Sequence, residues 1–120
     1  MWNFKQLKAW QAARRLVVDV YAIADRLPQE ERFGLASQLK RSANSIGANI
    51  AEGSGRPMPR DRAQFLGYAI ASADETEHHL VVAIDLGFVP VTDGIDLTTR
   101  LDEIRRMLKA LRHRSLNESR

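Results

Sequence analysis

The sequence predicts an all-α protein, an up-down antiparallel four-helix bundle formed by one domain over residues 1–120. Three observations lead to this fold class. Apolar residues recur at alternating steps of three and four along four segments, which is the spacing of a helix with one buried stripe. Stretches containing proline or glycine separate these segments, and none alternates apolar and polar residues as a half-buried strand does. Because the connections are short, consecutive helices are expected to pack antiparallel.

The first helix is expected over about 4–27. Asn3 can cap its N-terminus, and Gln6 can reach back to complete a capping box. Pro28 is expected to end the helix, because the residue before a proline avoids the helical conformation. The apolar stripe of this helix is Trp10, Ala13, Val17, Val20, Ala24 and Leu27.

The second helix is expected over about 30–52. Gly53 and Gly55 are predicted to end it, because glycine accepts the left-handed conformation that closes many helices. Its stripe is Leu35, Leu39, Ser42, Ile46 and Asn49, so that one amide falls where an apolar residue is expected.

The third and fourth helices are expected over about 59–86 and 93–115. Pro59 is a favoured first-turn residue, and Asp61 suits the positive N-terminal end of a helix. Gly87 is predicted to end the third helix. The third stripe is Leu66, Ala69, Ala73, Thr76, Leu80 and Ala83, and the fourth is Leu97, Leu101, Ile104, Leu108 and Leu111.

Composition favours a cytoplasmic protein that does not enter a membrane. The chain has no cysteine, and therefore neither disulfides nor thiolate chemistry. Its N-terminus lacks the basic start and apolar run of a signal peptide. The longest apolar run, residues 80–84, is far too short to cross a bilayer. The formal charge of +3 permits contact with nucleic acid without requiring it.

The stretch "ANIAEGSGR", residues 48–56, places Asn49 and Glu52 one helical turn apart. A polar side chain on a buried stripe must be hydrogen-bonded, and a single asparagine there can fix register and assembly. Glu52 lies near a helix C-terminus, where the dipole disfavours an anion, so Arg41 or Arg56 is expected to pair with it. We favour this structural interpretation over a binding or catalytic carboxylate.

The segment "FLGYAIA", residues 65–71, is apolar around the whole helix, and residues 16–24 are similar. Every helix of a four-helix monomer must expose one face to water, so a contiguous apolar surplus predicts a partner. The simplest partner is a second copy of the chain. The expected interface residues are Phe65, Tyr68 and Ile70; the alternative is that these are isolated surface apolar residues.

Glu75 and His78 have the Glu-x-x-His spacing of di-iron proteins built on four-helix bundles. Such a site needs a second motif of this kind, but His113 has Ala110 three residues before it. Both Glu75 and His78 also lie off the apolar stripe. We therefore expect no metal and no cofactor. No Ser-His-Asp arrangement, phosphate-binding glycine loop or zinc-ligand spacing is present, so no catalytic residue is predicted.

Charge is unevenly distributed along the chain. Residues 61–86 carry five acidic side chains against one arginine, whereas 100–120 carry seven Arg or Lys against three acidic residues. Arg105, Lys109 and Arg112 lie four and three apart and are predicted to form one ladder. Two interpretations remain open. The ladder either pairs with the acidic helix of a neighbouring subunit or binds phosphate backbones. Aromatic residues are not interleaved with these cations, which argues against base recognition.

The chain resembles the 23S ribosomal RNA intervening-sequence protein family, also called four-helix bundle proteins. The opening "FKQLKAWQAA" (4–13) resembles that of the family, and residues 27–56 contain its S-I-x-x-N-I-A-E-G core. "FLGYAIASADETE" (65–77) and "DLGF" (85–88) match later landmarks. Gly47 stands where the family commonly has proline. The residues that carry the signature are Ser45, Ile46, Asn49, Ile50, Ala51, Glu52 and Gly53.

This resemblance implies a bacterial homo-oligomeric bundle, with a ring of five chains favoured. Some family members are encoded inside intervening sequences of ribosomal RNA genes. A related bundle is the accessory subunit of the reverse transcriptase of diversity-generating retroelements, and is considered to bind nucleic acid there. We therefore expect a non-enzymatic scaffold or nucleic-acid-associated accessory protein, with RNA or DNA bound at low sequence specificity. The alternatives are a metal-dependent enzyme on the same bundle and a scaffold for protein alone.

Overall fold

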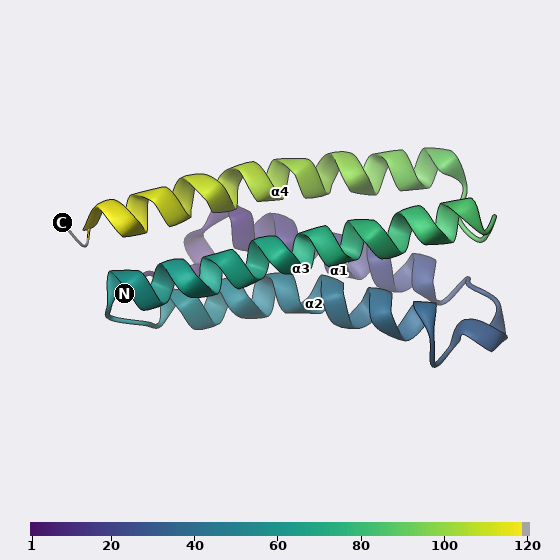
Figure 1. The fold of residues 1–120 in the computed structure, drawn as a ribbon, viewed down its shortest axis with the longest axis horizontal. Coiled ribbons are helices and arrows are strands. Elements are labelled where there is room, and N and C mark those ends of the chain that lie inside the picture. Colours follow the sequence, from purple (N-terminus) through teal and green to yellow (C-terminus); the bar gives the residue numbers. More distant parts are fainter. Residues whose placement is uncertain (119–120) are drawn as a thin grey trace.

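Four long helices run side by side in alternating directions in the computed structural model, which describes residues 1–118 (Figure 1). They are α1 (Lys8–Ala24), α2 (Leu35–Ser54), α3 (Pro59–Asp85) and α4 (Val91–Glu118). Two short 3₁₀ helices, η1 (Phe4–Gln6) and η2 (Gln29–Glu31), precede α1 and α2. No strand occurs in residues 1–118, so the all-α fold with four helices is confirmed. Both termini lie at the same end of an elongated bundle measuring 49 × 24 × 20 Å.

The first helix is shorter than the predicted range 4–27. Leu7 is extended, with φ −76° and ψ 126°, and this interrupts the helical conformation between η1 and α1. Asn3 does act as a cap, since its side chain accepts a hydrogen bond from the Lys5 N–H at 3.2 Å, but it caps η1 rather than α1. The second helix likewise begins at Leu35 instead of 30.

The core follows the predicted stripes of α3 and most of α4. All six stripe residues of α3 are buried, as are four of the five in α4, with Leu111 half-buried. In α1 the stripe is rotated, because Ala9, Leu16 and Ile23 enter the core while Trp10 and Val17 are half-buried at its edge. In α2 the prediction for Asn49 was wrong. Ile50 is the fully buried residue at this level, and Asn49 lies half-buried beside it.

The prediction for two glycines was correct only in part: α2 does end at Gly55, its C-cap, but neither Gly53 nor Gly55 has the left-handed conformation expected of it. Gly53 lies inside α2 and is buried, and Gly55 has φ −80°, which is ordinary right-handed backbone. Gly53 is needed for packing. A Cβ there would lie 2.8 Å from the Phe65 Cβ and 3.2 Å from the Arg62 carbonyl oxygen. Within residues 1–118 the residue with positive φ is Gly87, at +77°, which follows the α3 C-cap Leu86, so the predicted end of the third helix is confirmed.

The α2–α3 interface is held by hydroxyl pairs as well as apolar contact. The Thr76 hydroxyl donates to Ser42 Oγ at 2.9 Å, and Ser45 bonds to Ser72 one turn away. Ser42 and Thr76 are completely buried, and their bonds to each other offset the loss of water. Small side chains thus bring these two helices close together. No helix in residues 1–118 combines the length and the apolar character needed to cross a membrane.

Candidate nucleic-acid interface

Cations collect at the end of the bundle that holds both termini. Residues 1–15 carry four Lys or Arg and no acidic side chain, and 106–118 carry four against Glu118 alone. We call these two segments the basic end. By contrast, residues 73–105 carry eight acidic side chains against two arginines. This stretch comprises the C-terminal half of α3, the α3–α4 connection and the N-terminal half of α4. The charge is therefore separated along the long axis of the molecule.

Arg105 does not belong to an exposed ladder, contrary to the prediction. Its side chain is only 13% exposed, and its guanidinium donates to Asp74 at 3.2 Å and also to Glu77 and Asp102. Burial opposes its charged form, but the hydrogen bonds to Asp102 and Glu77 outweigh burial and raise the pKa of Arg105 above its ordinary value. The acidic helix therefore pairs with the basic helix inside one chain, and Arg105 joins α3 to α4.

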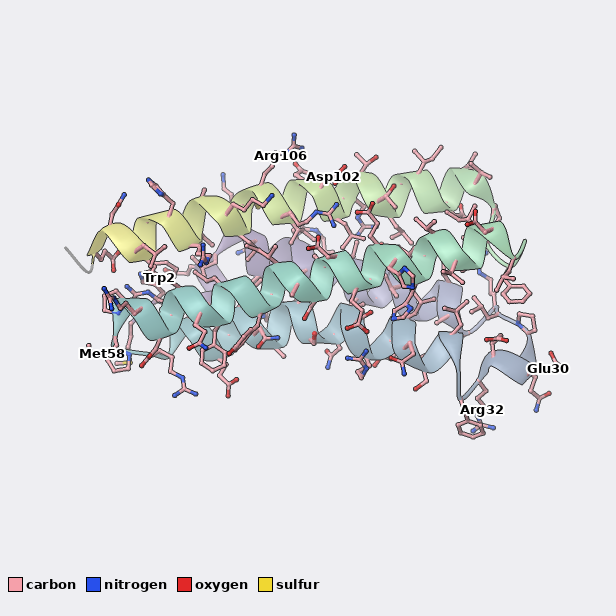
Figure 2. The ribbon with its side chains drawn as sticks, in the orientation of Figure 1. Trp2, Glu30, Arg32, Met58, Asp102 and Arg106 are labelled. Atoms are coloured by element: carbon pink, nitrogen blue, oxygen red, sulfur yellow. The ribbon has the colours of Figure 1, made fainter. Side chains whose placement is uncertain are left out.

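Lys109 and Arg112, the other two candidates, are exposed on the second half of α4. Arg106 is exposed as well, and it points away from the bundle along the outer edge of α4 (Figure 2). None of the three forms an ion pair within residues 1–118. Sequence reasoning missed Arg106 because three-four spacing selected the side of the helix that contains Arg105. The candidate phosphate-binding cations are therefore Arg106, Lys109 and Arg112, with Arg106 in place of the predicted Arg105.

The predicted oligomer interface is divided between two sides of α3. Phe65 lies beside α2, with its ring edge-on to Tyr68 at 5.5 Å and the Arg56 guanidinium 4.6 Å from its centroid. Ile70 lies on the opposite flank, where it lines a groove with Lys109 and Arg112. Residues 65–71 are therefore not one free apolar surface, because Leu66 and Ala69 are buried in the core and Ile70 lies toward α4. Tyr68 remains 46% exposed.

Asn49 and Glu52 have separate partners. The Asn49 amide donates to the Ser45 carbonyl oxygen of its own helix at 2.9 Å. Glu52 is exposed and lies 3.9 Å from Arg56, one of its two expected partners, whereas Arg41 pairs with Glu75 instead. Both contacts are local, and no contact in residues 1–118 brings the two side chains together as a binding pair.

Glu75 pairs with His79 rather than with His78. The Glu75 carboxylate lies 3.1 Å from His79 Nε2 and also accepts from Arg41. The His79 hydrogen bond, assisted by Arg41 and opposed by burial, lowers the pKa of Glu75 below its ordinary value of 4.5. His78 is exposed beside Asp74 and Glu77. Across residues 1–118, no group of three His, Cys, Asp or Glu side chains is arranged to hold a metal ion.

A buried arginine that sequence reasoning missed joins the chain ends. Arg62 is 2% exposed, donates through Nε to the Ser115 hydroxyl at 3.0 Å and pairs with Glu118. The Trp2 ring, at the same end of the bundle (Figure 2), lies 4.3 Å from its guanidinium carbon. The sequence did contain a signal that Arg62 is buried, because Arg62 lies four residues before Leu66 and so continues the apolar stripe of α3. This cluster fixes the N-terminus, the start of α3 and the end of α4 to one another.

The model of the family described as 23S rRNA-intervening sequence protein matches residues 5–110. The chain belongs to this family. A solved structure of similar fold is that of a protein with unknown function from the S23 ribosomal protein family of Bacteroides thetaiotaomicron VPI-5482. It is 25% identical, with a TM-score of 0.80, and the match covers 86% of this chain and 96% of that chain. No curated protein matches. The sequence resemblance is thus confirmed, and the family assigns no activity.

Proposed function

We propose that this member of the 23S rRNA-intervening sequence protein family is a non-enzymatic, homo-oligomeric scaffold that holds nucleic-acid backbones at its basic end. The observation that supports this most directly is the exposure of Arg106, Lys109 and Arg112 without carboxylate partners in residues 1–118. Glu118, the acidic residue of the segment 106–118, pairs with Arg62 and Arg114 instead. Each cation that neutralises a phosphate releases counterions, which favours binding at low salt.

Sequence discrimination is expected to be poor. Contacts to phosphates position a protein without reading bases, and no Phe, Tyr or Trp lies among residues 105–118 to stack on them. The proposed partners are therefore RNA or DNA recognised through charge. The setting expected for this activity is the bacterial cytoplasm.

Assembly would multiply this weak interaction. We extend the proposal to a ring of parallel bundles, with five chains favoured by the family resemblance. In such a ring every basic end would lie on the same face, and linked weak sites bind far more tightly than one. Support comes from apolar side chains left exposed on two helices that do not pack against each other, Val18 and Tyr21 on α1 and Tyr68 and Val81 on α3.

A mobility-shift titration tests the proposal. The variant Arg106→Gln/Lys109→Gln/Arg112→Gln should weaken binding of RNA and DNA duplexes several-fold. It should also reduce the slope of log affinity against log salt by about 0.7 to 0.9 for each phosphate that the variant no longer neutralises. A charge-matched control, Arg26→Gln/Arg32→Gln/Lys40→Gln, removes three cations outside the basic end and should leave binding nearly unchanged.

Two results would contradict the proposal. One is the absence of any shift at low salt with excess protein, which would favour a scaffold for protein alone. The other is equal weakening by both triple variants, which would make net charge, rather than the basic end, responsible.

The metal-dependent alternative has its own test. Elemental analysis of protein purified without added metal should find no stoichiometric transition metal.

A further inference from the structure

A groove runs between α3 and α4 at the basic end of the bundle. It has a volume of about 520 Å³ and lies in the size class of small-ligand sites. Its lining combines an apolar floor with nitrogen-bearing side chains from α4. The lining residues are Gly67, Ile70, Lys109, Arg112, His113 and Leu116.

Gly67 opens this groove. It is a glycine in the interior of a helix, where it weakens the helix relative to alanine, and its backbone is not in the left-handed region. A Cβ at this position would lie 3.6 Å from Arg112 Nε, so the arginine passes close over the helix backbone. A larger side chain would occupy the space that Arg112 and the groove now share.

The groove also differs in charge from the next depression along the same two helices. That depression, around His78 and Val81, includes Asp74 and Glu77 together with Arg105, which pairs with both. Among residues 1–118, no carboxylate lines the groove at Gly67. An anion between α3 and α4 is therefore attracted to Lys109 and Arg112, whereas Arg105 beside Asp74 is already neutralised by carboxylates.

We propose that the α3–α4 groove receives one unstacked nucleotide of a single strand. This inference rests on the proposed function and adds a preference for single strands. The base would contact the apolar floor at Ile70, and Lys109 and Arg112 would bind the flanking phosphates. His113 stands at the rim, where an imidazole ring or a guanidinium plane can stack on a base. A duplex keeps its bases inside the stack, so it places no base in the groove and meets Lys109 and Arg112 through its phosphates alone.

The surrounding charge favours a polyanion over a small anion as the occupant. Arg106 lies three residues before Lys109 on the outer face of α4 and continues the cationic surface beyond the groove. A strand that places one nucleotide in the groove can therefore bring its next phosphates to Arg106. The floor lacks hydrogen-bonding side chains, so it does not select one base over another.

Fluorescence anisotropy with a labelled single-stranded RNA and a duplex of the same length tests this site. Wild-type protein should bind the single strand more tightly. Gly67→Leu fills the groove and should reduce single-strand affinity by about tenfold, the scale of stacking for one base. Duplex affinity should fall far less, because the leucine displaces Arg112 alone while Arg106 and Lys109 still bind phosphates. The control Ala71→Leu adds the same side chain at an exposed position one turn further along α3 and should affect neither.

Retained duplex binding in Gly67→Leu serves as the internal check that the variant folds. Equal loss of single-strand and duplex binding, or equal affinity of wild-type protein for the two, would overturn the groove inference while leaving phosphate binding in place. A change in particle mass caused by Gly67→Leu would assign the groove to a contact between subunits and also overturn it. Failure of wild-type protein to bind either RNA would refute the proposed function itself.

Discussion

At the scale of single residues, the charged side chains of this protein have two distinct roles. Arg62 and Arg105 are largely withdrawn from water and bound by carboxylates, so they hold helices together. Lys109 and Arg112 are exposed and lack such partners within residues 1–118. Residue type alone does not distinguish these roles, because the difference arises from the carboxylates that the fold places opposite each cation.

The buried arginine supports a prediction of stability. Glu118→Gln removes the carboxylate that faces the almost fully buried Arg62, and leaving such a group poorly satisfied costs about 1–3 kcal/mol of unfolding free energy. Arg114→Gln removes the exposed partner of the same carboxylate and should cost less than about 1 kcal/mol. Urea denaturation of the two variants measures the difference. Equal losses would show that Arg62 does not depend on Glu118.

Glu75 supports a prediction about pH. Its pKa in the folded protein lies below 4.5, so the folded state favours the ionised carboxylate. The stability that Glu75 contributes is therefore complete above its unfolded pKa and is lost as pH falls through the lower, folded pKa. Thermal melts from about pH 6 to about pH 3 should show a smaller acid-induced decrease in Glu75→Gln than in wild type.

At the scale of helices, two glycines of α2 are expected to respond oppositely to alanine. A Cβ at Gly47 would meet Trp10 and Ala13 at 3.7–3.9 Å, which is ordinary contact, so Gly47→Ala should stabilise the protein by up to about 1 kcal/mol through helix propensity. A Cβ at Gly53 would lie 2.8 Å from Phe65, so Gly53→Ala should destabilise it by about 1–3 kcal/mol. Calorimetric melting of both variants provides the measurement, and a shared sign would contradict the packing described here.

The same helices explain what the sequence could and could not predict. The number, type and approximate position of the helices follow from apolar spacing, and the α3 stripe was correct at every position because its buried residues recur regularly. In α2 both Ser42 and Ala43 are buried, so the stripe shifts and Ile50 replaces Asn49. The role of Gly53 could not be recognised, since it depends on the approach of α3. In the candidate site, Lys109 and Arg112 are exposed, as the predicted ladder requires. Asp102 lies one turn before Arg105 and could be seen in the sequence, whereas Asp74 and Glu77 reach Arg105 only because α3 packs against α4.

At the scale of the whole molecule, basic and acidic side chains are separated along the long axis of the bundle. Antiparallel helices bring residues 1–15 and 106–118 to one end, although they are far apart in the sequence (Figure 1). The acidic stretch 73–105 crosses the connection between α3 and α4 at the other end. A polyanion is therefore expected to approach the end that holds the termini and to be repelled from the opposite end.

Assembly is the last prediction and concerns the outer faces of α1 and α3. α1 packs against α2 and α4 but not against α3, so the outer faces of α1 and α3 point in opposite directions. Val18 on α1 is 65% exposed, and Val81, on the side of α3 next to α4, is 43% exposed. Both lie in the C-terminal halves of helices that run the same way, so parallel neighbours in a ring would bring them to similar heights.

We therefore expect light scattering at micromolar concentration to give a particle several times the 13.6 kDa of one chain. Val18→Glu or Val81→Glu should lower the mass, because each places an unpaired charge in the contact. Val18→Lys combined with Val81→Glu should restore part of the assembly, since opposite charges would then face each other across the contact. The control Phe33→Glu alters an 87% exposed side chain on the α1–α2 connection and should leave the mass unchanged. A monodisperse wild-type monomer would refute the ring, and an oligomer insensitive to both valine variants would place its interface elsewhere.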